Sequence, residues 1–340
     1  MMNKNMNNNY FLIACLFLMV TSCKPTPRGE RIVSVSILPQ KYFVERIAGD
    51  IVSVNVMIPP GMNPATCDLR TEQLRKLYDS QIYFAIGYLP FETIHLYPVL
   101  KQRDSTVLIN HSERVFLLDG TCGHIDVEHE HEQTHEYEHG QIHEQTHEQG
   151  HEREQGHEHK HKHEHDYGNE HGSEKNHRLG VDPHIWLSPD YAQSICMEIF
   201  AALSSAYPER EAFFQTNYET LSRDIEVIKQ RLQLAVTASA QKAFLIYHPA
   251  LTYFANDFGL EQISVENDGK EPGPTYLADI IGQVKTKGIR VIFIQKQFDV
   301  RNAAMIAKVT GCKLIQIDPL NENWMAEMER MVEILEHEFN

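Results

Sequence analysis

From Arg31 onward, short runs of apolar and β-branched residues alternate with longer stretches in which apolar residues recur every three to four positions. The first pattern is typical of buried strands and the second of amphipathic helices, so their alternation predicts parallel βαβ units. In the first part of the chain the pattern predicts strands at 31–37, 51–58, 81–86 and 106–110, and helices at 40–48 and 71–78. Residues 31–207 are therefore expected to form an N-terminal α/β lobe.

The C-terminal part of the chain repeats this alternation. It predicts strands at 243–247, 262–265, 289–295 and 313–317, and helices at 250–258, 275–287, 301–309 and from about 324 onward. Gly259, Gly288 and Gly311 each follow one of these helices, and glycine commonly ends a helix because it adopts the left-handed backbone conformation at little cost. A second α/β lobe is expected over residues 241–340.

A long helical pattern connects the two lobes. It opens at Pro208 and continues with few helix breakers to about residue 236, and the connector is assigned to residues 208–240. Its roughly 28 helical residues would extend about 40 Å at 1.5 Å per residue, enough to pass from one lobe to the other. The predicted fold class is thus α/β, with two parallel-sheet lobes joined by a long, rigid connector helix.

The N-terminus carries the pattern of an export signal. Residues 11–20 form an apolar run that is too short to span a bilayer but suits the core of a secretion signal. Val-Thr-Ser then precedes Cys23, and this order resembles a bacterial lipoprotein box, in which the cysteine thiol takes the lipid. We expect a signal peptide over 1–22, a lipid on Cys23, a linker over 23–30 and an exported protein anchored to the membrane of the cell envelope. The alternative is an ordinary secreted protein with an incidental cysteine.

Residues 124–177 interrupt the α/β pattern with an insert rich in histidine and acidic residues. The insert holds 15 of the 20 histidines of the chain, and His-Glu-Gln-Thr-His-Glu occurs in it twice. A segment so poor in apolar residues cannot bury enough surface to offset the entropy of ordering, so a disordered loop is expected. Weak, exchangeable zinc binding is predicted for it, with a solvated acidic linker as the alternative. The candidate weak ligands are His129, His131, His135, His139, His143, His147, His151, His157, His159, His161, His163 and His165.

Charge and cysteine content narrow the classes of function. The 340 residues include 31 Lys and Arg against 47 Asp and Glu, and the net charge of −16 would repel a nucleic acid, which is therefore not expected as a partner. None of the six cysteines forms a Cys-x-x-Cys pair, which excludes a Cys-based zinc ribbon or a thioredoxin-type motif. Export would permit disulfides, with buried free thiols as the alternative, among Cys67, Cys122, Cys196 and Cys312.

Three residues outside the insert carry the pattern of a metal site. His184 comes just before a predicted helix, His248 lies between a predicted strand and the next helix, and Asp318 directly follows a predicted strand. A helix N-terminus disfavours imidazolium, so both rings should stay neutral and able to bind a cation. Ligands bind at the carboxyl ends of parallel strands, which places His248 and Asp318 at the same sheet edge. Two imidazoles and a carboxylate suit Zn²⁺, with Mn²⁺ or Fe²⁺ less favoured by the nitrogen count.

Several motifs resemble those of one known family. They are Leu38-Pro39, Pro59-Pro60-Gly61, Ile86-Gly87 with Glu92, Asp182-Pro183-His184-Ile185-Trp186-Leu187-Ser188-Pro189, Tyr247-His248-Pro249-Ala250 and Ile317-Asp318-Pro319-Leu320. With these motifs the chain is similar to the zinc/manganese solute-binding proteins of ABC transporters, the family of ZnuA and TroA, over about residues 31–122 and from 181 to the C-terminus. The motifs around His184 and His248 are specific to that family, whereas the others are weak alone.

This resemblance implies a metal-capturing protein and not an enzyme. It implies Zn²⁺ bound in the cleft between the two lobes by His184, His248 and Asp318, and delivery of the ion to the permease of an ABC importer. A monomer is expected. Zinc-specific members of the family carry a His- and acid-rich loop at the position of the insert, so the insert would act as a weak scavenger or sensor of zinc.

The sequence departs from the family at one ligand position. The family usually has a ligating histidine soon after the Pro-Pro-Gly turn, and Ala65 occupies that position here and cannot coordinate a metal. The fourth position could be filled by water, by Glu92 or by a histidine of the insert. Cys67 is a further candidate as a soft ligand, with a buried apolar thiol as its alternative.

Two other classes of function fit parts of the sequence. A metal-dependent surface adhesin or a metal-storage lipoprotein would use the insert for its main function. A metallohydrolase would use the two histidines, the aspartate and an open coordination position to activate water. No His-Glu-x-x-His arrangement lies on an apolar helix, however, and this disfavours hydrolysis.

Overall fold

The computed structural model describes residues 31–64, 67, 69–101, 105–118, 181–266, 272–298 and 300–340. Several features predicted from the sequence lie outside these described residues: the signal peptide, the lipidation site Cys23, the linker, Ala65, Cys122 and all the candidate histidines of the insert. The described parts before and after the insert belong to one compact unit of the chain.

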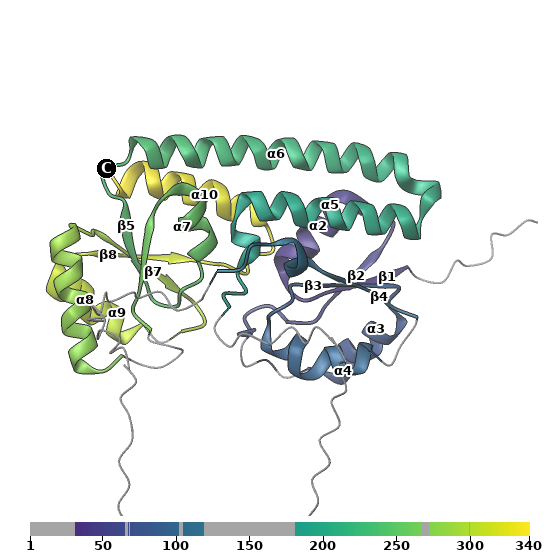
Figure 1. Ribbon diagram of the computed structural model, residues 1–340, viewed down its shortest axis with the longest axis horizontal. Coiled ribbons are helices and arrows are strands. Elements are labelled where there is room, and N and C mark those ends of the chain that lie inside the picture. The colour runs from purple at the N-terminus through teal and green to yellow at the C-terminus, as the bar shows by residue number, and fades with distance from the viewer. Residues whose placement is uncertain are drawn as a thin grey trace, which may run out of the picture. The chain divides into compact units, whose positions relative to one another are not determined.

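The first part of the fold is built on a parallel four-stranded sheet of order β2-β1-β3-β4 (Figure 1). Its strands are β1 (Ile32–Val35), β2 (Ser53–Val56), β3 (Ile82–Ala85) and β4 (Val107–Asn110). Its helices are α2 (Leu38–Ala48), α3 (Thr71–Asp79), α4 (Tyr97–Leu100) and α5 (Pro189–Ala206). All four residues of β3 are buried, as expected for an apolar strand in the middle of a sheet that helices cover on both faces.

A second parallel sheet repeats this topology with the order β6-β5-β7-β8. Its strands are β5 (Ala243–Ile246), β6 (Glu261–Ser264), β7 (Val291–Gln295) and β8 (Lys313–Ile317). Its helices are α7 (Thr252–Phe258), α8 (Pro274–Lys287), α9 (Arg301–Thr310) and α10 (Trp324–Glu338). Gln295 lies opposite Ile317 in register, so the chain leaves β7 and β8 side by side at one sheet edge. The predicted α/β fold class with two parallel sheets is confirmed.

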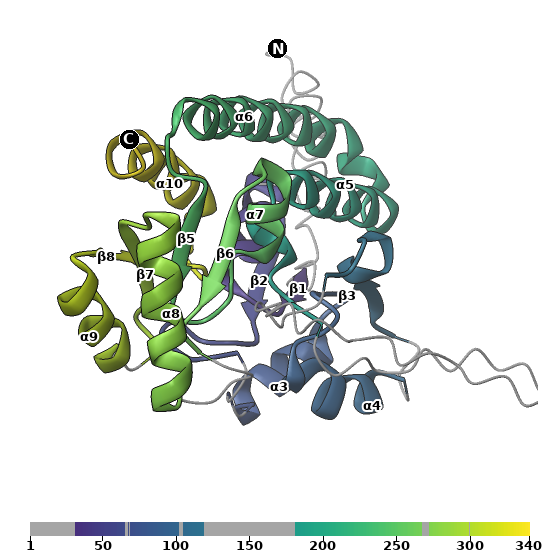
Figure 2. The ribbon, with the colours of Figure 1, turned by 60° about the vertical axis from the view of Figure 1, so that its left-hand side comes forward.

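The long connecting helix is α6 (Glu211–Ala238), which follows a short 3-10 turn, η4 (Pro208–Arg210). It packs on α2 and α5 beside the first sheet and on α10 beside the second (Figures 1 and 2). Its buried residues are Phe214, Leu221, Ile225, Ile228, Leu232, Ala235 and Val236. These residues belong to one apolar cluster that reaches both sheets, so α6 is part of a shared core and not a free spacer. No described helix is both long enough and apolar enough to cross a membrane.

The chain on either side of the insert meets at one tyrosine. The hydroxyl of Tyr253, on α7, accepts a hydrogen bond from Leu118 N (3.2 Å) and donates one to Asp182 O (2.8 Å). Asp182 N also donates to Leu118 O (3.0 Å). Leu118, Asp182 and Tyr253 therefore form a closed neck at which the chain leaves and re-enters the described fold.

Several short elements are absent from the sequence-based prediction. Besides α4, they are η1, a π-helix (Glu92–Leu96), and two 3-10 turns, η2 (His111–Arg114) and η3 (Ile185–Leu187). Elements of three to five residues contain too little apolar periodicity to be distinguished from loops. Helix α7 also begins later than predicted, because Ala250 N donates to His248 O (2.8 Å) in a tight turn before it.

The described cysteines lie in the apolar interior. Cys196 and Cys312 are buried free thiols, and burial raises the pKa of the Cys196 thiol well above its ordinary value. They pack in two different apolar clusters, so no disulfide joins them. The alternative of buried free thiols is confirmed for both. Cys67 is also buried, in the same cluster as Cys196.

Candidate metal centre

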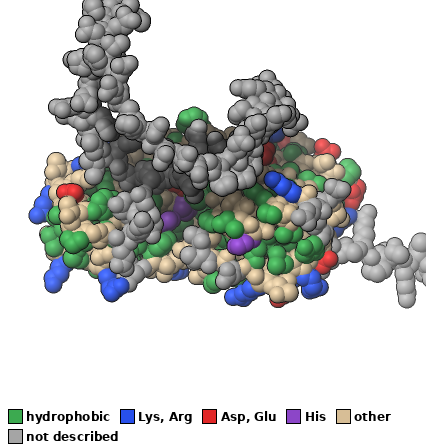
Figure 3. Space-filling model, turned by 60° about the horizontal axis from the view of Figure 1, so that its bottom comes forward, with side chains coloured by type: hydrophobic (Ala, Val, Ile, Leu, Met, Phe, Trp, Pro, Cys, Tyr) green, Lys and Arg blue, Asp and Glu red, His purple; other side chains and the backbone are tan. Residues whose placement is uncertain are grey.

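The structure brings His184 and His248 together. His184 directly precedes η3, and His248 lies two residues after the end of β5. Their ring centroids are 5.3 Å apart and the ring planes meet at 70°. The side chains are 13% and 27% exposed, respectively. Histidine side chains are visible at the surface on the face opposite α6 (Figure 3). Two imidazoles from distant parts of the sequence thus lie side by side within reach of solvent.

A carboxylate holds each of these rings. His184 Nδ1 lies 2.6 Å from Asp182 Oδ1, and His248 Nδ1 lies 2.7 Å from Glu266 Oε2. An Nδ1–H group that donates to a carboxylate fixes the ring and leaves Nε2 as the nitrogen for a metal. Among the described residues, none is hydrogen bonded to Nε2 of either ring. The pair therefore has the chemistry of two oriented metal ligands.

Carboxylates, and not helix N-termini, are the groups that contact Nδ1 of the two rings. Burial alone would raise the pKa of Asp182, but the charge of His184 and its hydrogen bonds hold that pKa below the ordinary value. Helix α7 begins only at Thr252, so the predicted influence of a helix N-terminus on His248 is wrong. His184 precedes only a three-residue 3-10 turn, whose dipole is correspondingly short.

The end of β7 fixes the backbone of His248. Gln295 is buried, donates through Nε2 to His248 O (2.7 Å) and accepts from His248 N (3.3 Å). The ring of Phe298 stacks on the His248 imidazole, with centroids 4.6 Å apart and planes at 15°. The imidazole is therefore held by a carboxylate at Nδ1, an amide at its backbone and an aromatic ring on its face.

Asp318 follows β8, the strand next to β7. Its backbone N donates to Glu327 Oε1 (2.9 Å), and its own Oδ1 accepts from Leu320 N (3.2 Å). The other carboxylate oxygen lies 3.7 Å from Lys296 Nζ, and the side chain is 25% exposed. Gln295 links this residue to the imidazole pair, because it binds the backbone of His248 and lies opposite the residue before Asp318.

The three predicted ligands are not gathered into one group. In the part of the chain that the structure describes, no three His, Cys, Asp or Glu side chains are placed together to hold a metal ion. His184 and His248 form a pair, and Asp318 lies at the end of the adjacent strand. The role of Asp318 as a third ligand remains a prediction.

Glu92 does not serve as an additional ligand. It is fully buried, and its two oxygens accept hydrogen bonds from Ile86 N (2.8 Å), Gly87 N (2.7 Å) and Ser36 Oγ. Burial raises the pKa of this carboxyl group despite these bonds. Its role is structural, because it ties the π-helix η1 to the residues that follow β1 and β3. Cys67, the other candidate ligand, is buried in the apolar core.

Some residues of the site were not found by sequence reasoning. Glu266 follows a predicted strand and Gln295 ends one, so the strand-end argument used for His248 would have identified both. Phe298 and Glu327 lie in a loop and on a helix and carry no comparable signal.

A third histidine–carboxylate pair lies elsewhere in the fold. His111 Nδ1 is 2.6 Å from Glu198 Oε2, and the His111 ring stacks on Phe84. His111 is only 1% exposed, so it belongs to the core around the first sheet. Among the described residues, the same pairing therefore occurs once in the interior and twice at the candidate centre.

Comparison with models of protein families shows to which family the chain belongs. The family model described as ZnuA, zinc-uptake complex component A, periplasmic, matches residues 33–338. The chain belongs to the ZnuA family. The match spans both sheets, the connecting helix and the three candidate ligands, and it confirms the resemblance found in the sequence motifs. ZnuA-family chains are binding components of uptake complexes and not enzymes.

Curated relatives of this ZnuA-family chain include zinc-binding proteins. The zinc-binding protein AdcA of Streptococcus pyogenes is 34% identical over 158 residues, which are 46% of this chain and 31% of that protein. The zinc-binding lipoprotein AdcA of Streptococcus pneumoniae is 21% identical over 336 residues, which cover 95% of this chain and 58% of that protein. The chain thus spans less than two thirds of the length of the curated relatives that it matches first.

Solved structures share the fold. A crystal structure of ZnuA superimposes with a TM-score of 0.72 at 24% identity and covers 92% of this chain and 100% of its own. The laminin-binding protein Lmb of Streptococcus agalactiae, described as having adhesin and metal transporting activity, gives a TM-score of 0.68 at 17% identity, with 92% and 100% covered. Likeness at this level of identity supports the two-sheet α/β architecture.

Proposed function

We propose that this ZnuA-family chain captures Zn²⁺ outside the cytoplasm and delivers it to the permease of an ABC importer. The observation that carries the proposal is the pair of adjacent imidazoles, His184 and His248, each oriented by a carboxylate at Nδ1. Rigidly oriented Nε2 atoms at a partly exposed site suit an exchangeable transition metal. The family match and the zinc-binding relatives support zinc as the cargo.

The proposed ligands are His184, His248 and Asp318. Two neutral imidazoles and one carboxylate form a nitrogen-rich set that zinc prefers, and a tetrahedral site would keep one position for water. The side chain of Asp318 is partly exposed, and its partner Lys296 is 62% exposed. A dication would therefore replace only a weak, solvent-screened ion pair when it binds the carboxylate.

Metal titration of the mature protein tests the ligand set. His184→Ala or His248→Ala should abolish the tight one-to-one site, because two protein ligands are too few to hold the ion. Asp318→Asn should weaken binding less, since its amide oxygen can still coordinate. His337→Ala, on the exposed end of α10, is the control and should bind as the unaltered protein does. Tight binding that survives in both histidine variants would overturn the assignment.

We further propose that the mature chain begins at Cys23 and is held at the cell envelope by a lipid on that residue. The family description as periplasmic and the lipoprotein name of the pneumococcal relative support this location. Cys23→Ser should move the protein from the membrane fraction to the soluble fraction. Retention of this variant in membranes would contradict the proposal.

The insert between residues 124 and 177 is proposed to bind zinc weakly and at several positions. Its 15 histidines are in the sequence, and each free imidazole can bind one ion through a neutral nitrogen. Adhesion is not proposed as a second function, because the likeness to the laminin-binding protein is one of fold.

A further inference from the structure

Trp186 lies at the contact between the segment that carries His184 and the loop that carries Asp318. It is the middle residue of η3 and is fully buried. Its ring centroid lies 5.1 Å from that of His184. Its Nε1–H donates to the carbonyl oxygen of Pro319 (2.8 Å), the residue after Asp318. One side chain therefore touches a proposed ligand ring and also holds the loop of another proposed ligand.

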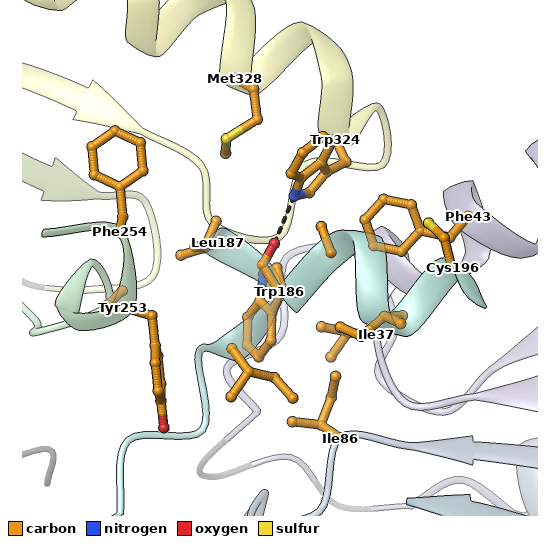
Figure 4. Packing of buried hydrophobic residues seen from close by; sticks show 14 of the residues in the cluster. Ile37, Phe43, Ile86, Trp186, Leu187, Cys196, Tyr253, Phe254, Trp324 and Met328 are labelled. Atoms are coloured by element: carbon orange, nitrogen blue, oxygen red, sulfur yellow. Dashed lines mark hydrogen bonds between the residues drawn. The ribbon is translucent and has the colours of Figure 1, made fainter. Parts of the chain in front are cut away.

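The main chain of Trp186 is fixed by a second tryptophan. Trp324, the first residue of α10, donates its Nε1–H to Trp186 O (2.7 Å), as the dashed line in Figure 4 shows. The Trp324 ring packs edge-on against Phe43 of α2, with centroids 5.3 Å apart. The two buried indoles thus make two hydrogen bonds of the same kind, but only the one from Trp186 reaches the Asp318 loop.

We propose that Trp186 is a positioning residue that couples His184 to Asp318 and sets the spacing of these two zinc ligands. This inference rests on the zinc site proposed above. Ligands must be held within about 0.5 Å of their working geometry by neighbours whose own conformations are fixed by packing. The buried Trp186 indole meets this requirement, because its Nε1–H is hydrogen bonded to Pro319 O. Its ring is rigid, so the distance between its backbone and Pro319 is fixed.

Other bonds hold the His184 segment independently of the Trp186 indole. Tyr253 OH donates to Asp182 O (2.8 Å), and Ser188 Oγ donates to Asp257 Oδ2 (2.5 Å). Replacing Trp186 by phenylalanine removes the N–H donor and keeps an aromatic ring in the core. The segment should therefore stay docked in this variant, while the link to Pro319 is lost.

The experiment compares Trp186→Phe with Trp324→Phe in the full-length mature chain. Each variant loses one buried indole N–H···O=C bond, so thermal unfolding should show similar losses of Tm. Zinc affinity, measured by competition with a chromophoric chelator, should fall about tenfold in Trp186→Phe, the low end of the effect of outer-shell partners. It should fall less in Trp324→Phe, because that variant keeps the bond from Trp186 Nε1 to Pro319 O. The visible absorption spectrum of bound Co²⁺ should likewise change more in Trp186→Phe, because that variant loses the direct link to the Asp318 loop.

Two results would overturn the proposal. One is unchanged zinc affinity and an unchanged Co²⁺ spectrum in Trp186→Phe. The other is an equal loss of affinity in both variants, which would make Trp186 a structural residue only. Failure of the zinc site itself is recognised separately, because His184→Ala would then leave affinity and spectrum as in the unaltered protein.

A second measurement does not depend on the folding of Trp186→Phe. The chain has 2 tryptophans, so Trp324→Phe leaves Trp186 as the sole source of indole emission. Saturation with Zn²⁺ should change this emission, and adding Asp318→Asn should reduce the change at saturation, since the coupling runs through the Asp318 loop. Emission that does not respond to zinc, or responds equally with Asp318→Asn, would contradict the coupling.

Discussion

A histidine that binds a metal acts together with the group behind its second nitrogen. At the candidate centre these groups are Asp182 and Glu266, which lie 2 and 18 positions from their histidines. The carboxylate keeps the proton on Nδ1, aims Nε2 outward and makes the imidazole a stronger donor. Affinity for zinc should therefore depend on residues that never touch the ion.

Glu266→Gln tests this dependence. Glutamine can still accept the hydrogen bond from His248 Nδ1 but lacks the negative charge, so zinc affinity should fall about tenfold. Glu198→Gln is the matched control, because Glu198 holds the buried His111 in the same way away from the centre, and it should leave zinc affinity unchanged. Equal affinities of the two variants would show that the charge of Glu266 has no part in zinc binding.

Glu92→Gln should destabilise the fold and leave the zinc site intact. Glu92 accepts hydrogen bonds from Ile86 N and Gly87 N through different oxygens, and glutamine offers only one acceptor, so a buried N–H loses its partner. Urea denaturation at about pH 5 should show a loss of about 1–3 kcal/mol in the free energy of unfolding.

The pH dependence of this effect has a definite sign. Burial raises the pKa of Glu92 in the folded state, so its contribution to stability is complete below the ordinary pKa of glutamate and declines as pH rises through the raised value. The deficit of Glu92→Gln should be smaller at about pH 8 than at about pH 5. A deficit that grows with pH would show that Glu92 is a favoured anion in the fold.

At the scale of elements, the ends of the strands determine where the chemistry lies. His248 and Glu266 each come two residues after a strand, and Asp318 directly follows another. They lie near one another because the strands of this sheet pair in parallel, so that β5, β6, β7 and β8 all end at the same edge. A slip in the pairing of β7 with β8 would move Asp318 away from His248.

This arrangement explains what could be predicted from the sequence. Apolar runs locate the strands, and a strand-end rule then locates His248 and Asp318. The same rule places Glu266 at this edge, but it does not show that the Glu266 carboxylate is the one that contacts the His248 ring, because that contact depends on how the side chains pack. The bond from Trp186 to Pro319 spans 133 positions and arises from packing, which a periodicity pattern does not record.

Deleting residues 124–177 should leave the tight zinc site and remove the weaker ones. The neck formed by Leu118, Asp182 and Tyr253 holds both sides of the deletion in place, so the fold around His184 does not depend on the chain between them.

In the chain that keeps residues 124–177, the weak sites should empty as pH falls from about 7.5 to about 5.5, because free histidines protonate near pH 6.5.

Calorimetric titration with zinc checks this prediction at several pH values. The complete chain should lose its weak sites first on acidification, and the deletion variant should show only the tight site throughout. Loss of the tight site on deletion would show that a histidine of the insert completes the coordination shell.

At the scale of the whole molecule, the core continuous with α6 links the two sheets energetically. The buried face of this helix contacts α2, α5 and α10, and ion pairs such as Arg46 with Asp224 (2.7 Å) reinforce it at the surface. Two sheets that share one core should unfold together, and zinc bound to the folded state should raise the single Tm of the chain.

Leu232→Ala and Leu234→Ala form a matched pair on α6 that tests this coupling. Leu232 is fully buried, so its truncation should cost about 2–5 kcal/mol and lower the Tm of one undivided transition. Leu234 is 69% exposed, and its truncation should change stability by less than about 0.5 kcal/mol. Differential scanning calorimetry would contradict a shared core if Leu232→Ala separated the transition into two peaks.

The neck at Tyr253 also makes the molecule suitable for grafting. Leu118 and Asp182 are joined backbone to backbone at 3.0 Å, so a foreign domain whose own termini lie close together could replace the chain between them with little strain on the scaffold. The graft would end just before Asp182, which lies two residues before His184 of the imidazole pair. A fluorescent protein inserted at this point would sit next to the proposed zinc site, and the ZnuA-family scaffold would then serve as a genetically encoded zinc reporter.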